Sequence, residues 1–149
     1  MVENPKKKRK PSSSTPKQAL FESRQWACEI ARLAHDRHCR DIVVLELAEL
    51  SPVALHFVIG TGTSDQQIRS VAREIEERGQ EKRFKVLGRA GMQQGRWALV
   101  DFVDVVVHLF DEEYRNFYDL ELLWGDAPKI NWQRDRKPAA EDTGETEKL

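Results

Sequence analysis

The sequence has few cysteines and no long apolar run. Its only two cysteines, Cys28 and Cys39, form no CxxC pattern and are too few for a disulfide scaffold, so we expect free thiols in a reducing compartment. No stretch approaches the roughly 18 to 20 consecutive apolar residues of a membrane helix. Asp104 and His108 interrupt the most apolar segment, residues 103–110. We therefore predict a cytoplasmic protein that makes no contact with a membrane.

The net charge of −1 is spread unevenly along the chain. Residues 1–17 contain six Lys or Arg and one Glu, whereas residues 133–149 contain four basic and five acidic residues. The intervening residues therefore carry a net charge of −5. Within them, residues 101–126 contain eight carboxylates and a single base, Arg115. This acidic segment favours a basic partner.

The length of 149 residues suits one domain. Residues 1–15 are rich in Lys, Pro and Ser, lack the apolar stretch of a secretory signal, and predict a disordered basic tail. Residues 133–149 predict a disordered charged tail. The folded domain is expected over residues 16–132. Thr15 suits a helix N-cap, and Pro16 suits the first helical position.

Hydrophobic periodicity and turn residues predict the order of the elements. A capping box at Ser64 and Gln67 begins the second helix, Gly79 is expected to end it, and Asp111 is expected to cap the third. Helices are expected at residues 16 to about 38, 64–79 and 111–117. Residues 118–124 are expected to continue the last helix or to pack beside it. Strands are expected at residues 42–47, 55–59, 84–87, 96–102 and 104–110. The order predicts an α/β fold with one mixed, mostly five-stranded sheet flanked by helices.

The turn at residues 60–65, Gly-Thr-Gly-Thr-Ser-Asp, lies between a strand and a helix, where backbone N–H groups can bind an anion. It matches neither GxGxxG nor GxxxxGK[ST], and Asp65 adds negative charge where a phosphate would lie. A tight turn with a helix cap is the favoured interpretation. A nucleotide-binding or nucleotidyltransferase-like enzyme is the alternative.

Asp101, Asp104 and His108 suggest a metal or acid–base site. In a regular strand, however, Asp104 and His108 lie about 13 Å apart and cannot bind one ion unaided. We therefore expect no catalysis, metal or cofactor here.

The basic run at residues 6–10 has three possible interpretations. It is a tail whose charge has little function, a segment weakly attracted to ribosomal RNA, or a nuclear-import signal.

Two segments are more specific. Residues 95–110 read GRWALVDFVDVVVHLF, and residues 118–128 read YDLELLWGDAP. Together with FVIGTGTSDQQ at residues 57–67, they resemble the ribosomal silencing factor, or Iojap-like, family. The resemblance spans about residues 18–132.

Two positions depart from the family pattern. His56 stands where Tyr is usual, and Val103 stands where Gly usually separates the two strands. Because β-branched residues resist positive φ, we expect Val103 to adopt another turn if the family's glycine uses that region.

The resemblance implies a fold similar to that of nucleotidyltransferases without their chemistry. It implies binding to ribosomal protein fourteen of the large subunit, which blocks joining of the subunits and represses translation under nutrient limitation or in stationary phase. It further implies a homodimer when the protein is free.

Several residues are candidates for contacting that partner. Apolar anchors are expected among Trp97, Tyr118, Leu120 and Trp124, although core packing is an equal alternative for the two tryptophans. His108 is expected to form a hydrogen bond within the sheet or across the interface. The polar candidates, including the glycine of the LWGDA motif, are Asp101, Asp104, Glu121, Gly125 and Asp126.

Overall fold

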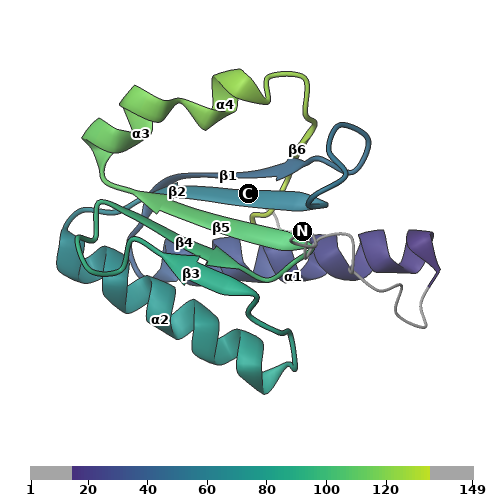
Figure 1. The fold of residues 1–149 in the computed structure, drawn as a ribbon, viewed down its shortest axis with the longest axis horizontal. Helices are drawn as coiled ribbons and strands as arrows, with labels where there is room; N and C mark the ends of the chain where they lie inside the picture. The colour runs from purple at the N-terminus through teal and green to yellow at the C-terminus, as the bar shows by residue number, and fades with distance from the viewer. Residues whose placement is uncertain (1–14, 135–149) are drawn as a thin grey trace, which may run out of the picture.

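The computed structural model describes residues 15–134, which form one mixed sheet with helices on both sides (Figure 1). The helices are α1 (Pro16–Asp36), α2 (Asp65–Glu81), α3 (Glu112–Tyr118) and α4 (Leu120–Leu123). The strands are β1 (Arg40–Glu46), β2 (His56–Thr61), β3 (Gly88–Ala90), β4 (Trp97–Asp101), β5 (Val105–Phe110) and β6 (Lys129–Ile130). The expectations for residues 1–14 and 135–149 lie outside the described residues.

The sheet has the strand order β3-β4-β5-β2-β1-β6. Only β2 and β5 pair in parallel, whereas the other neighbours are antiparallel. Helix α2 follows β2 on one side of the sheet and α3 follows β5 on the other (Figure 1). The α/β class and the mixed sheet flanked by helices are confirmed.

Side chains close to each helix start fix where the helices begin. The Thr15 hydroxyl accepts from the Gln18 amide at 3.1 Å, and the Ser64 hydroxyl accepts from the Gln67 amide at the same distance. The Asp111 carboxylate accepts from the amide of Tyr114 at 2.7 Å. All three predicted caps are confirmed, because a cap depends only on neighbouring residues.

The third predicted strand, at residues 84–87, was wrong. The sheet has six strands, whereas a mostly five-stranded sheet was expected. Phe84 stacks on Trp26 of α1 with ring centroids 4.8 Å apart, so it contributes to the core instead of a strand. Pairing with β4 begins where the Leu87 amide donates to the carbonyl of Asp101 at 2.7 Å, and β3 follows at Gly88–Ala90. Strand β6 has only two residues, too few for a periodic signal.

Gly79 does not end α2, which continues to Glu81. A Cβ atom at Gly79 would lie 2.5 Å from Cε1 of Phe102 and 3.2 Å from Cζ2 of Trp26. The glycine therefore allows α2 to approach these rings. The left-handed residue after the helix is Arg83, with a φ of 67°.

Val103 adopts a positive φ of 79° although it is β-branched. The Asp104 amide donates to the carbonyl of Phe102 at 3.0 Å, which closes a three-residue γ-turn around Val103. The Val103 amide donates to the carboxylate of Asp101 at 2.8 Å. These two hydrogen bonds hold Val103 at positive φ in the tight β4–β5 connection. Asp104 consequently lies in the turn, and β5 begins one residue later.

Two apolar clusters fill the two sides of the sheet. The larger cluster joins α1 and α2 to strand residues such as Val58, Val100 and Val107. It also contains Cys28 and Cys39, which are confirmed as free thiols. Burial raises the pKa of Cys39 to about 11, so this thiol stays protonated. The smaller cluster lies on the opposite side, under α3 and α4.

Candidate protein-binding face

The sheet side opposite α1 and α2 is only partly covered. Alternation in β4 places Ala98 and Val100 against the larger cluster, so Trp97, Leu99 and Asp101 point to the other side. These three side chains are each only half-buried. We call the surface formed by Trp97, Leu99 and Asp101 of β4 with Val106 and His108 of β5 the open face.

An aromatic cluster holds Trp97 in place at one end of the open face. Its ring centroid lies 4.6 Å from that of Tyr118 in α3 and 4.9 Å from that of Phe110 in β5. Its indole Nε1 donates to Nδ1 of His108 at 3.2 Å. Trp97 therefore has both a packing role and an exposed edge, and it borders a hollow of about 310 Å³ that Leu99 also lines. A side chain fixed in this way loses little entropy when a partner covers it.

His108 is a buried, neutral imidazole. It is 5% exposed, and desolvation lowers its pKa to about 4 despite the opposing effect of Asp101. Because Nδ1 accepts from Trp97, Nε2 carries the proton. Within residues 15–134, Nε2 has no hydrogen-bond partner. The predicted hydrogen bond within the sheet is thus present at one nitrogen, and the other nitrogen is a donor next to the open face.

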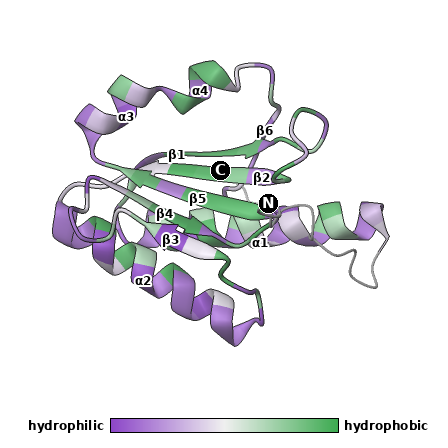
Figure 2. Ribbon diagram, in the orientation of Figure 1, coloured by the Kyte–Doolittle hydropathy of each residue, from purple (hydrophilic) through white to green (hydrophobic). Residues whose placement is uncertain are grey.

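Helices α3 and α4 expose large apolar side chains. Phe117, Leu122 and Leu123 are 77%, 76% and 69% exposed, and Tyr118 is 44% exposed. We call these four residues the apolar rim, and Figure 2 shows α4 as a largely hydrophobic helix at the molecular surface. Large apolar side chains exposed together in this way are unusual on a monomeric protein.

Two of the four predicted anchors belong to the core rather than to the surface. Leu120 and Trp124 are one helical turn apart and pack inward on the smaller cluster, where Trp124 meets the ring of Phe57 at 6.1 Å. The intervening Leu122 and Leu123 point outward. Sequence reasoning missed these two leucines and Phe117. An outward position for them could have been inferred from the helical spacing of Leu120 and Trp124.

The predicted carboxylates also differ in their surroundings. Glu121 pairs with the buried Arg115 at 3.0 Å, and Arg115 donates to the hydroxyl of Thr61 at 2.9 Å. Glu121 therefore holds α4 against the end of β2. In contrast, Asp126 is exposed, as is the neighbouring Gly125, after α4. Asp101 and Asp104 lie half-buried at the β4–β5 turn.

The turn at residues 60–65 forms hydrogen bonds to the start of α2, although Thr63, Ser64 and Asp65 are exposed. The Thr63 amide donates to Oε1 of Gln67 at 2.6 Å, and the side chain of Ser64 caps α2. A Cβ at Gly62 would lie 2.3 Å from Cγ1 of Ile68, so this glycine allows close packing of the turn on its helix. These contacts explain the turn as a helix cap.

Residues 15–134 contain no group of three or more His, Cys, Asp or Glu side chains that could hold a metal ion. None of their helices has the length and hydropathy needed to cross a membrane.

The fold and the face described above define a small α/β protein whose exposed surface has the composition of a protein-binding site. A sequence model of the family described as ribosomal silencing factor during starvation matches residues 21–148. The ribosomal silencing factor RsfS of Bacillus subtilis is 43% identical over 98 residues, which cover 66% of this chain and 83% of that protein. The chloroplastic Iojap protein of Arabidopsis thaliana is 36% identical over 109 residues, covering 73% of this chain and 45% of that protein.

Solved structures agree with these sequence relatives. A crystal structure of a protein from Chromobacterium violaceum superposes with a TM-score of 0.65 at 31% identity, covering 71% of this chain and 86% of that one. A second, from Bacillus halodurans, has a TM-score of 0.62 at 32% identity and covers 74% of this chain and 98% of that one. The chain belongs to the ribosomal silencing factor family, whose names describe regulation of the ribosome rather than an enzymatic reaction.

Proposed function

We propose that this protein binds ribosomal protein fourteen of the large ribosomal subunit and sterically blocks joining of the small subunit. Translation is thereby repressed in the cytoplasm under nutrient limitation or in stationary phase. The observation that carries the proposal is the apolar rim beside the open face, on a chain of this family. A bound partner would cover Phe117, Leu122 and Leu123, which the described fold leaves in solvent.

The charge of this region favours a basic partner such as a ribosomal protein. Residues 101–126 carry eight carboxylates and one base, and that base, Arg115, is occupied by Glu121. Exposed carboxylates such as Asp126 would steer the encounter and select its orientation. Apolar contacts through Phe117, Leu122 and Leu123 would supply short-range complementarity.

The direct test is co-sedimentation with purified large subunits, followed by a subunit-joining assay. The protein should pellet with large subunits and reduce the yield of joined ribosomes as small subunits are added. The proposal is wrong if the chain stays in the supernatant, or if it binds and subunit joining is unchanged.

The apolar rim is tested with Leu122→Ser/Leu123→Ser. Both side chains are more than two-thirds exposed, so the fold should be retained. Losing burial of about 1.5 kcal/mol for each leucine should weaken subunit binding about 100-fold. The matched control is Leu50→Ser/Val53→Ser, which changes two exposed residues of the β1–β2 loop and should bind normally. Equal binding by the two double variants would remove the rim from the interface.

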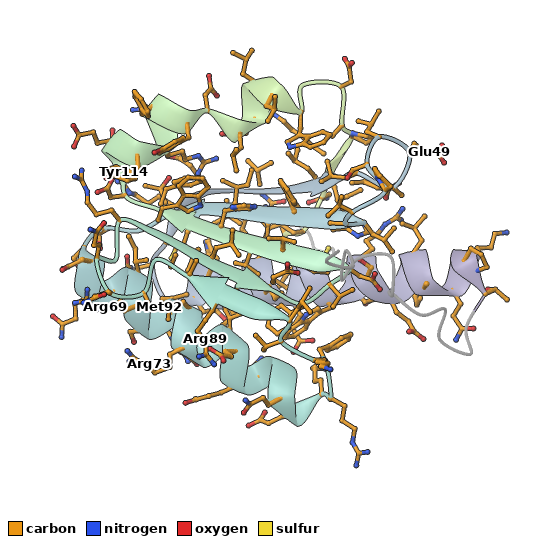
Figure 3. All side chains as sticks on the ribbon, viewed as in Figure 1. Glu49, Arg69, Arg73, Arg89, Met92 and Tyr114 are labelled. Carbon is orange, nitrogen blue, oxygen red and sulfur yellow. The ribbon has the colours of Figure 1, made fainter. Side chains whose placement is uncertain are left out.

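The contribution of charge is tested with Asp126→Lys. This substitution should slow association with the large subunit, most strongly at low salt, because an exposed charge acts mainly on the encounter rate. Glu49→Lys, an exposed reversal in the β1–β2 loop (Figure 3), is the control and should leave the rate unchanged. An unaltered rate for Asp126→Lys would exclude that carboxylate from steering.

Nucleotide binding at residues 60–65 remains the alternative function. Calorimetric titration with nucleotides and a divalent metal separates it from the proposal. We expect no heat of binding, because the Thr63 and Gln67 amides already donate within the molecule and Asp65 adds negative charge where a phosphate would lie. A saturable heat that Ser64→Ala abolishes would favour the enzyme instead.

A further inference from the structure

A basic groove lies on the other side of the molecule, between the end of α2 and β3. It has a volume of about 620 Å³, and its lining includes Glu76, Arg83, Phe84, Lys85, Leu87 and Arg89. Helix α2 and the open face border opposite sides of the sheet (Figure 1). A ligand in this groove would therefore not compete with a protein bound at the apolar rim.

The groove is positively charged. Three of its lining side chains are cationic, and Glu76 is the only carboxylate. Arg89 pairs with Glu76 through two of its nitrogens, including Nε at 3.1 Å. Within residues 15–134, neither Arg83 nor Lys85 forms an ion pair. Two exposed cations are thus left to bind an anion, in a core that is acidic as a whole.

Two arginines of α2 lie beyond the groove. Arg69 and Arg73 are one helical turn apart, and Glu76 follows on the same helical face. The guanidinium of Arg69 donates to the carbonyl of Gln93 at 3.3 Å and pairs with Asp65 at 3.4 Å. Figure 3 shows Arg69, Arg73 and Arg89 projecting from the α2–β3 side of the molecule. Arg69 and Arg89 are in ion pairs, whereas Arg73, Arg83 and Lys85 form none within residues 15–134. Three such cations suit an extended polyanion better than a single small anion.

Apolar surfaces lie among these cations. Phe84 stacks with one face on Trp26, with an angle of 7° between the rings, and remains half-buried in the groove lining. Leu87 is 39% exposed beside it. Cations that bind phosphates, interspersed with a fixed aromatic ring and an aliphatic side chain, are the pattern of single-stranded nucleic-acid sites. An acidic peptide would use the charges but not the ring.

We propose that this groove binds single-stranded RNA. Arg83, Lys85 and Arg73 contact phosphates, and a base packs against Phe84 and Leu87. The choice of RNA rests on the proposed function, because a protein bound to the large subunit lies next to ribosomal RNA. The site would be a second contact with the subunit, separate from the one made by the apolar rim.

The test measures binding of the full chain to a short fluorescent single-stranded RNA by anisotropy across a salt series. The groove variant is Arg83→Gln/Lys85→Gln, and the control is Lys17→Gln/Lys129→Gln, which removes two exposed lysines elsewhere. Each lost phosphate contact lowers the logarithmic salt slope by about 0.7, or affinity about fivefold at about 0.1 M salt. The groove variant should therefore bind about 25-fold more weakly, with a slope smaller by about 1.4.

Each other outcome is decisive. If the groove variant binds RNA like the unaltered chain, or no more weakly than the lysine control, the groove is not an RNA site. If a glutamate-rich peptide binds as tightly as RNA and is weakened by the same substitutions, the assignment to RNA is wrong. The result is independent of the co-sedimentation assay. A chain that binds RNA through the groove but does not pellet with large subunits would refute the proposed function alone.

Discussion

Replacing Gly79 with alanine places two physical effects in opposition. Within a helix, alanine is favoured over glycine by about 1 kcal/mol, and Gly79 lies inside α2. The added Cβ would, however, lie 2.5 Å from Cε1 of Phe102 and 3.2 Å from Cζ2 of Trp26. Both rings are buried, at 4% and 2% exposure, so neither can move into solvent.

The steric effect should exceed the helical preference. Overpacking of a close-packed core costs about 1 to 3 kcal/mol, and two rings must shift together at this site. We expect Gly79→Ala to lower the free energy of unfolding by about 1 kcal/mol net of the gain in helix propensity. The melting temperature of a domain of this size should then fall by about 4 °C.

The assay is urea unfolding followed by far-UV circular dichroism, in a double-mutant cycle with Phe102→Leu. Leucine lacks the ring atoms that the new methyl group meets, so alanine at position 79 should be tolerated better in that background. A positive coupling of about 1 kcal/mol is expected. The steric argument fails if Gly79→Ala stabilises the unaltered chain, or if the two substitutions are additive.

Two further predictions concern the β4–β5 turn and acid stability. Val103→Gly should be more stable than Val103→Ala by about 0.5 to 1 kcal/mol. Both variants lose the two γ-methyl groups of valine, but only glycine adopts a φ of 79° without strain. Equal stability of the two variants in urea would contradict a strained turn. Because the folded-state pKa of His108 is about 4, below its ordinary value of 6.5, this residue's stabilising contribution is complete above pH 6.5 and is lost as the pH falls toward 4. The stability lost over this pH range is on the order of 3 kcal/mol. His108→Gln should remove this pH dependence from the profile of unfolding free energy against pH. A profile unchanged by the substitution would show that the imidazole is not buried in its neutral form.

The two proposed contacts differ in charge. The open face and α3–α4 lie among carboxylates, whereas the groove between α2 and β3 is lined by three cations and one carboxylate. This difference suits the proposed site, where a basic ribosomal protein and RNA are neighbours. The two proposed contacts are separable because Leu122 and Lys85 lie on opposite sides of the sheet.

The local sequence determined where the helices begin and most of the strands. The caps Thr15, Ser64 and Asp111 and the two strands within residues 96–110 were predicted, because they depend on neighbours a few residues away. The acidic character of residues 101–126 and the likeness to ribosomal silencing factors also required no coordinates.

Only the tertiary structure decided the roles of several residues that the sequence leaves equivalent. Gly79 is a packing contact rather than a helix end because Phe102, distant in sequence, lies against it. Glu121 turns toward Arg115, while Leu122 and Leu123 remain in solvent because the sheet beneath α4 is already covered by Leu120 and Trp124. Backbone preferences are local, whereas burial and pairing depend on what the fold brings together from elsewhere in the chain.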